Sequence, residues 1–121
     1  LKFFVGRNMV NLCQGRSDSK EVLDKFADES VDYVMVDGAH EYEPVRDDVI
    51  NWWPKLKKDG IMFGDDVELT SVFEGMKAGL RDRGMPTYGT NSGREQTWYC
   101  TRNGDNQGLE KLIPGVNVLH E

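Results

Sequence analysis

The sequence predicts an α/β domain with a mostly parallel sheet and flanking helices. Short apolar runs alternate with longer amphipathic runs along the chain, which is typical of this class. The run Val31–Val36 is nearly all apolar, as expected for a parallel strand covered on both faces. A length of 121 residues suits a single domain with a single core.

The first part of the chain predicts a strand followed by a helix. The segment Val10–Cys13 is a candidate short strand, which ends before Gly15. The polar residues 17–19 then supply capping side chains for a helix over residues 20–27. The strand at residues 31–36 follows directly, so this stretch has the strand–helix–strand order of an α/β fold.

The next helix is predicted from Pro44, in its first turn, to about Lys58. Pro54 lies inside this span and predicts a kink or an early end. The segment 55–60 has the cations and the glycine of a helix C-terminus. One helix face carries the apolar residues Val45, Val49, Ile50, Trp53 and Leu56. Because adjacent helical residues point about 100° apart, we expect one of Trp52 and Trp53 in the core and the other either partly exposed or at an interface.

The second half predicts two further strands and a helix. Residues 61–64 form a second central-looking strand, residues 71–83 a helix that ends at Gly84, and residues 97–101 a late strand. The sequence after Asn103 is rich in Gly and Asn. We therefore divide the chain into an α/β domain, residues 1–103, and a weakly specified tail, residues 104–121.

Composition argues against several classes of function. The chain has 15 Lys and Arg residues and 21 Asp and Glu residues, which gives a net charge of −6. This charge disfavours a basic surface that binds nucleic acid. No apolar run approaches the ~18 residues of a membrane-spanning helix. The two cysteines, Cys13 and Cys100, form no CxxC motif, which disfavours a zinc knuckle or a disulfide scaffold. We expect a cytoplasmic protein.

Acidic residues follow both apolar strands of the middle segment. Asp37 follows the first strand, and Asp65 and Asp66 follow the second. If these strands are parallel neighbours, the three carboxylates meet where α/β sheets bind ligands. Their mutual repulsion favours a shared cation such as Mg²⁺. The alternative is that each acid caps a helix or lies in solvent.

His40 lies three residues after Asp37 and is a candidate general base, because a neutral imidazole accepts protons near neutral pH. A purely structural histidine is the alternative. Tyr42 either lines the same pocket or packs on the core. The charged residues 46–48 are expected on a solvated helix face.

The segment VDYVMVDGAHEYEPVRDDVINWWPKLKKDGIMFGDDV, residues 31–67, carries a family resemblance. It contains D-G-x-H-x-Y, W-W-x-x-L and G-x-x-x-x-D-D, and it resembles class I S-adenosylmethionine-dependent methyltransferases. The most similar members are small-molecule O-methyltransferases of the macrolide-sugar and catechol types. The resemblance extends upstream through VNLCQGRSDS and covers about residues 3–101. It implies a Rossmann-like sheet.

The resemblance also implies roles for individual residues. Contacts with S-adenosylmethionine are implied for Ser17, Asp18, Asp37 and Gly38. Ligands of Mg²⁺ are implied for Asp37, Asp65 and Asp66. His40 matches the position of the general base. The implied reaction is metal-assisted methyl transfer to a hydroxyl group of a small molecule, a sugar or a phenol.

The family's first strand and glycine-rich loop should precede Phe3, and neither is in the sequence. The chain also begins with Leu1 rather than with methionine. Without the first strand, the strand at residues 31–36 has one unpaired edge. We expect a fragment of a longer protein. The alternatives are a sheet completed by a second copy of the chain, and a reduced relative without catalysis.

Three functions remain open at this point. The first is methyl transfer to a small-molecule hydroxyl. The second is a non-catalytic binding or assembly module that keeps the fold, and the third is a metal-dependent hydrolase that uses the same acids. We expect a small-molecule hydroxyl acceptor and neither a nucleic acid nor a membrane as partner, with a second copy of the chain as an alternative that completes the sheet.

Overall fold

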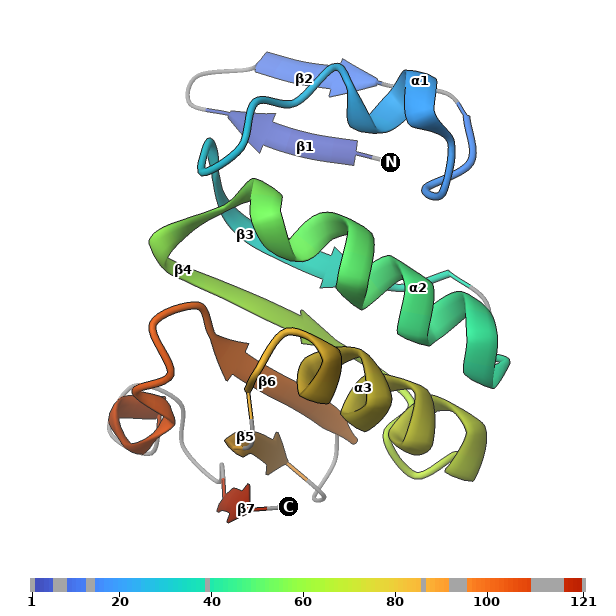
Figure 1. Ribbon diagram of the computed structural model, residues 1–121. Helices are drawn as coiled ribbons and strands as arrows, with labels where there is room; N and C mark the ends of the chain where they lie inside the picture. Colours follow the sequence, from blue (N-terminus) through green and yellow to red (C-terminus); the bar gives the residue numbers. More distant parts are fainter. Residues whose placement is uncertain are drawn as a thin grey trace.

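The computed structural model describes residues 2–5, 9–12, 15–38, 40–85, 87–91, 96–109 and 117–120. In chain order the elements are β1 (Lys2–Val5), β2 (Met9–Leu12), α1 (Lys20–Leu23), β3 (Val31–Val36), α2 (Tyr42–Trp52), η1 (Trp53–Lys55), β4 (Leu56–Gly64), α3 (Thr70–Asp82), β5 (Thr87–Asn91), β6 (Thr97–Thr101), η2 (Asn106–Gly108) and β7 (Asn117–His120). Figure 1 shows how they are arranged.

The main sheet has five strands in the order β3-β4-β6-β5-β7. Among the described residues of this sheet, only β3 and β4 pair in parallel, and the other three pairings are antiparallel. The predicted α/β class is therefore confirmed, whereas the mostly parallel sheet is confirmed only for β3 and β4. The connection between β5 and β6 is too short for a helical crossover, and short connections reverse the chain.

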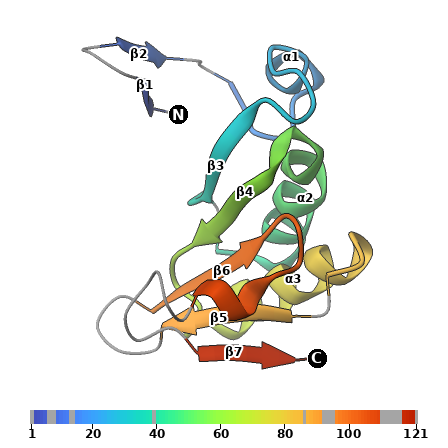
Figure 2. The same cartoon turned by 90° about the vertical axis from the view of Figure 1, so that its left-hand side faces the viewer.

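Helices α2 and α3 lie on the same side of the sheet (Figure 2). The core between them and the sheet contains Val49 of α2, Met62 of β4, Leu80 of α3 and Trp98 of β6, each fully buried. This single layer of helices decides the exposure of β3.

The prediction that both faces of β3 are covered is wrong. Tyr33 and Met35 are 64% and 42% exposed, whereas Val34 on the opposite face is buried. No described element covers the face that carries Tyr33 and Met35. Strand β3 also pairs only with β4 among the described residues, so it forms an edge of the sheet.

Strands β1 and β2 pair with each other in a separate two-stranded antiparallel sheet (Figure 2). The predicted strand over residues 10–13 is thus present as β2, although Cys13 lies outside the described residues. The predicted helix over residues 20–27 is shorter than expected. It ends at Leu23 and continues as turns in which Lys25 and Phe26 donate to carbonyls three residues back.

Helix α2 confirms the predicted effects of its two prolines. Pro44 lies in its first turn, and Pro54 ends the α-helix at Trp52 by forming the 3-10 turn η1. The expected helix C-terminus at residues 55–60 is wrong, because residues 56–60 belong to β4. Trp52 and Trp53 are both buried, so the expectation that one of them is partly exposed is wrong. The 3-10 turn changes the direction of Trp53 relative to a continuing helix.

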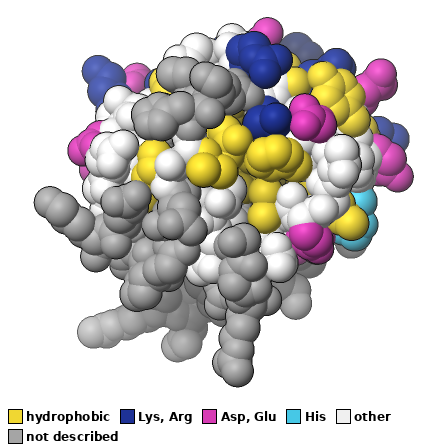
Figure 3. Space-filling model, turned by 90° about the horizontal axis from the view of Figure 1, so that it is seen from below, with side chains coloured by type: hydrophobic (Ala, Val, Ile, Leu, Met, Phe, Trp, Pro, Cys, Tyr) yellow, Lys and Arg dark blue, Asp and Glu magenta, His cyan; other side chains and the backbone are white. Residues whose placement is uncertain are grey.

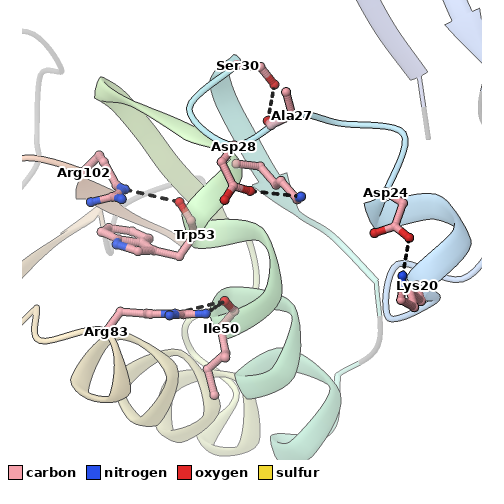
Figure 4. A network of polar contacts seen from close by, with 10 residues as sticks. Lys20, Asp24, Ala27, Asp28, Ser30, Ile50, Trp53, Arg83 and Arg102 are labelled. Carbon is pink, nitrogen blue, oxygen red and sulfur yellow. Dashed lines mark hydrogen bonds and ion pairs between the residues drawn. The ribbon is translucent and has the colours of Figure 1, made fainter.

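Two distant arginines, rather than local lysines, bind the carbonyl groups at the end of α2 (Figure 4). Arg83 donates from Nε and Nη2 to the Ile50 carbonyl, at 3.1 and 2.6 Å. Arg102 donates to the Trp53 carbonyl at 3.3 Å and lies over the Trp53 ring. These bonds satisfy acceptors that a helix end leaves free.

Helix α3 and strand β6 follow the sequence prediction closely, whereas β5, η2 and β7 were not predicted. Helix α3 spans Thr70–Asp82, and β6 spans the predicted Thr97–Thr101. The segment after residue 103 contributes β7, which pairs with β5, and the buried Asn106. The Asn106 side chain accepts from the Thr101 amide at 2.7 Å and donates to the Thr87 carbonyl at 2.8 Å.

Within the described part of the chain, every helix is too short or too polar to cross a lipid bilayer.

Candidate functional site

A small pocket lies at the carboxyl ends of the two parallel strands β3 and β4. Its lining residues are Val36, Asp37, Gly38, His40, Val45, Asp65, Asp66, Val72 and Trp98. The three acids at the strand ends therefore meet at one place, as the parallel pairing requires. The cavity volume is about 10 Å³. This is roughly the space that one water molecule needs.

His40 and Asp66 form the central polar contact of the pocket. The His40 Nε2 atom lies 3.0 Å from the Asp66 Oδ2 atom. The hydroxyl of Ser71, near the start of α3, donates to the His40 carbonyl and fixes the loop backbone. The His40 side chain is 61% exposed, so its ring is accessible to a ligand from solvent.

Asp66 has a left-handed backbone conformation, with φ of 62°. The turn is held by two backbone hydrogen bonds of 2.9 Å, from the Val67 amide to the Gln96 carbonyl and from the Leu69 amide to the Asp66 carbonyl. Aspartate tolerates this conformation better than most residues, and backbone outliers of this kind cluster at functional sites. The turn directs the Asp66 carboxylate toward His40.

The expected Mg²⁺ site is not supported by the arrangement of these residues. Within the described ranges, no group of three or more His, Cys, Asp or Glu side chains is placed to hold a metal ion. The Oδ2 atom of Asp66 is engaged by His40. Asp37, Asp65 and Asp66 therefore share a pocket without forming a metal-ligand set.

The predicted cofactor residues Ser17 and Gly38 approach each other through Asp48 of α2. The Ser17 hydroxyl donates to Asp48 Oδ1 at 2.6 Å. A Cβ atom added to Gly38 would lie 3.8 Å from Asp48 Oδ2. The structure thus brings the loop before α1 beside the end of β3, on the side of the pocket where α2 begins.

The Asp18 side chain is bound by Arg16 rather than by Asp48. It forms a bidentate pair with Arg16, at 3.0 and 3.1 Å, on the exposed surface. The hydrogen bond from Arg16 lowers the pKa of the Asp18 carboxyl. Ser17 and Asp18 do not cap α1, because their side chains are bound to Asp48 and Arg16, and Ser19 makes no side-chain cap either.

Asp48 is a site residue that sequence reasoning missed. It was expected on a solvated helix face, but it is half-buried, and burial raises the pKa of its carboxyl. Trp52, four residues later on the same helix, donates from Nε1 to the Ser17 carbonyl at 3.0 Å. The available signal was the spacing of Asp48 and Trp52, because residues four apart lie on the same face of a helix. Both residues bind Ser17.

Trp98 is a second missed residue, and no local motif indicates it. It lies on β6, far along the chain from the acidic loops, and it is fully buried while lining the pocket. Tyr42, in contrast, is not among the described lining residues. It is 40% exposed, and the Arg46 guanidinium lies 5.5 Å from its ring centre.

Cys100 takes no part in this site. The side chain is a free, fully buried thiol on β6. Burial raises the pKa of Cys100 to about 12. The thiol is therefore protonated at neutral pH and is a poor nucleophile.

Comparisons with known proteins give the site a family context. Residues 5–67 match a family described as a methyltransferase domain. An uncharacterized protein, y4gI, from Sinorhizobium fredii is 41% identical over 54 residues. That alignment covers 45% of this chain and 6% of the relative, so the chain spans a small part of that protein's length. No solved structure matches the chain.

Proposed function

The chain belongs to the methyltransferase domain family, and from this premise we propose that it transfers a methyl group from S-adenosylmethionine to a hydroxyl group of a small molecule. One structural observation carries this proposal. Asp37, His40 and Asp66 line a single pocket at the carboxyl ends of two parallel strands. This is the edge of an α/β sheet at which ligands bind.

The residues beside the pocket suit the polar cofactor. Ser17 and Gly38 both approach Asp48, and the missing Gly38 side chain leaves backbone accessible beside a half-buried carboxylate. Backbone and carboxylate groups of this kind recognise the hydroxyls and amino group of an adenosine. S-Adenosylmethionine, when bound, supplies a methyl group on a positively charged sulfur.

His40 is the proposed general base. With the Nε2 proton donated to Asp66, at 3.0 Å, the lone pair of Nδ1 is left to accept the proton of the substrate hydroxyl. The negative charge of Asp66 stabilises the imidazolium that results. Ser71 holds the backbone of His40 and thereby its distance from the strand ends. A sugar or a phenol is the proposed acceptor.

No step of this mechanism uses a metal ion, because the described acids do not form a ligand set. Asp37 is instead assigned to the cofactor side of the pocket, beside Gly38.

Calorimetric titration of the purified chain with S-adenosylhomocysteine tests the cofactor assignment. We expect saturable binding, and we expect Ser17→Ala to weaken it about five-fold, the equivalent of one hydrogen bond. Ser30→Ala is the matched control. The Ser30 hydroxyl also makes one hydrogen bond, to the Ala27 carbonyl at 2.6 Å, but away from the pocket.

Absence of binding to a chain that circular dichroism shows to be folded would contradict the proposal. An equal loss of affinity for S-adenosylhomocysteine in Ser17→Ala and Ser30→Ala would contradict only the role of Ser17.

A further inference from the structure

Trp98 lines the pocket and carries a hydrogen-bond donor that the proposed mechanism does not use. Its side chain is 0% exposed and lines the pocket together with the acids at the ends of β3 and β4. The Nε1 atom is buried and has no hydrogen-bond partner among the described residues. Buried donors are almost always paired in folded proteins, so an unpaired one at a pocket indicates a missing acceptor.

The position of this indole depends on Gly64, the last residue of β4. A Cβ atom on Gly64 would lie 2.6 Å from Trp98 Nε1 and 2.7 Å from the Val36 carbonyl oxygen. Real Cβ atoms do not approach other atoms this closely. Any side chain at residue 64 would therefore displace the indole from the pocket edge.

The indole of Trp52 differs from that of Trp98 in the hydrogen bonding of its Nε1 atom. Trp52 Nε1 donates to the Ser17 carbonyl at 3.0 Å and is satisfied within the protein. Trp98 and Trp52 are both buried, at 0% and 5% exposure. Both indoles are therefore buried, but only the Nε1 atom of Trp52 has a hydrogen-bond acceptor among the described residues.

The surroundings of the donor restrict the acceptor that it can take. Asp37, Asp65 and Asp66 line the pocket, and no lysine or arginine does so among the described residues. A carboxylate or a phosphate would be repelled by these acids. The cavity volume of about 10 Å³ admits one small group. A neutral hydroxyl meets all three conditions, because its oxygen accepts from the indole while its proton can be donated to a neighbouring base.

We propose that Trp98 Nε1 binds the oxygen of the acceptor hydroxyl and that the pocket thereby selects neutral alcohols and phenols over carboxylates and phosphates. This inference rests on the proposed function and specifies its substrate class. It assigns Trp98 as a substrate-binding residue, with Gly64 as the residue that leaves room for it.

The indole N–H resonances of a ¹⁵N-labelled chain report this contact directly. Trp98→Phe identifies the Trp98 signal by its loss and retains a ring of similar packing. With S-adenosylhomocysteine present, we expect phenol and methyl α-D-glucopyranoside to shift the Trp98 signal. Their charged counterparts, benzoate and methyl α-D-glucuronide, are expected to leave it unchanged. The Trp52 signal is the internal control, because that donor is already paired.

The proposal also predicts that Trp98→Phe binds the neutral probes about five-fold more weakly. Failure of both neutral probes to shift the Trp98 signal, while S-adenosylhomocysteine binds, would overturn this inference and leave the proposed function standing. An equal response to the charged probes would also overturn it. Failure of S-adenosylhomocysteine itself would instead contradict the proposed function. The wild-type measurements decide the matter even if the variant does not fold.

Discussion

The Asp48 carboxyl has a different environment in the structure from the one that the sequence predicts. In the sequence it is one of several charges on an amphipathic helix, whereas in the structure it is half-buried and accepts from Ser17. Burial is the largest cause of the raised pKa of its carboxyl, the hydrogen bond from Ser17 opposes it, and the charges of Asp18 and Asp47 add to it. The ionised form is therefore less favourable in the folded chain than in the unfolded chain.

We expect the gain in unfolding free energy of Asp48→Asn over the wild type to be larger at pH 8 than at pH 4. A raised pKa in the folded state means that protonation favours folding. This contribution is present below the ordinary pKa of 3.8 and is lost as the pH rises through the raised value. The asparagine still accepts from Ser17 but carries no charge. Urea unfolding of both proteins across this range measures the effect.

Asp59→Asn is the matched control, because its side chain is exposed on β4. A difference between wild type and Asp48→Asn that does not change with pH would contradict the role of burial.

His40→Ala is expected to lower turnover at least 100-fold, the low end of the effect of a general base. Its affinity for S-adenosylhomocysteine should stay within a factor of about two, because the side chain is largely exposed and binds Asp66 rather than Ser17 or Gly38. Steady-state assays with a phenol acceptor and calorimetry separate the two quantities. Wild-type turnover in the variant would exclude His40 as the base.

At the scale of the elements, α2 and α3 approach closely because α3 carries glycines at the contact. A Cβ atom on Gly79 would lie 2.6 Å from Val49 Cβ and 2.9 Å from the Arg46 carbonyl oxygen. Gly75, one turn earlier, meets the Tyr42 carbonyl oxygen in the same way. This packing holds the start of α2, and therefore the His40 loop, against the strand ends.

Gly79→Ala should destabilise the chain by up to about 2 kcal/mol. Overpacking costs roughly 1–3 kcal/mol, and the higher helix propensity of alanine returns about 1 kcal/mol. Chemical denaturation measures the change. Asp82→Ala, at an exposed position of the same helix, should change stability by no more than about 0.5 kcal/mol. A stabilised Gly79→Ala variant would show that the helices separate without cost.

The helix C-terminus of α2 shows where local sequence signals fail. The lysines and the glycine of residues 55–60 have the composition of a helix end, but β4 begins at Leu56. The carbonyls at the end of α2 are satisfied by Arg83 and Arg102, which are distant in sequence. Local composition could not identify these donors, because they arrive only after α3 and β6 pack.

At the scale of the whole molecule, one face of the main sheet is open at β3 among the described residues, and β3 and β7 are the two edge strands of that sheet. Tyr33 and Met35 are exposed on β3, which pairs with β4 alone. Figure 3 shows hydrophobic side chains gathered on the face seen from below. The pairing of β3 with a second copy of the chain stays a prediction, as does the cytoplasmic location.

Amide hydrogen exchange should be slowest in β4 and β6, which each pair with a strand on both sides and carry the fully buried Met62 and Trp98. The β1–β2 hairpin should exchange fastest among the strands, because it pairs only with itself. Mass spectrometry of peptic fragments measures this order. Equal protection of β1 and β4 would show that the hairpin belongs to the cooperative core.

The sequence by itself determined the helices and strands that have local signals. It also determined which residues meet at the carboxyl ends of the parallel strands. Apolar runs and proline positions placed β3, the start of α2, α3 and β6, and Pro54 indicated an early end of α2 as one of two outcomes. Because parallel strands end at the same sheet edge, the meeting of Asp37, His40 and Asp66 also followed from the order of residues.

Tertiary structure alone decided the contacts between distant segments. The burial of Asp48, the cap from Arg83 and the unpaired Trp98 donor each join residues that no periodicity connects. The antiparallel half of the sheet and the exposed face of β3 likewise depend on which elements pack together. Side-chain burial and hydrogen bonding are set by neighbours in space, and local propensity carries no record of those neighbours.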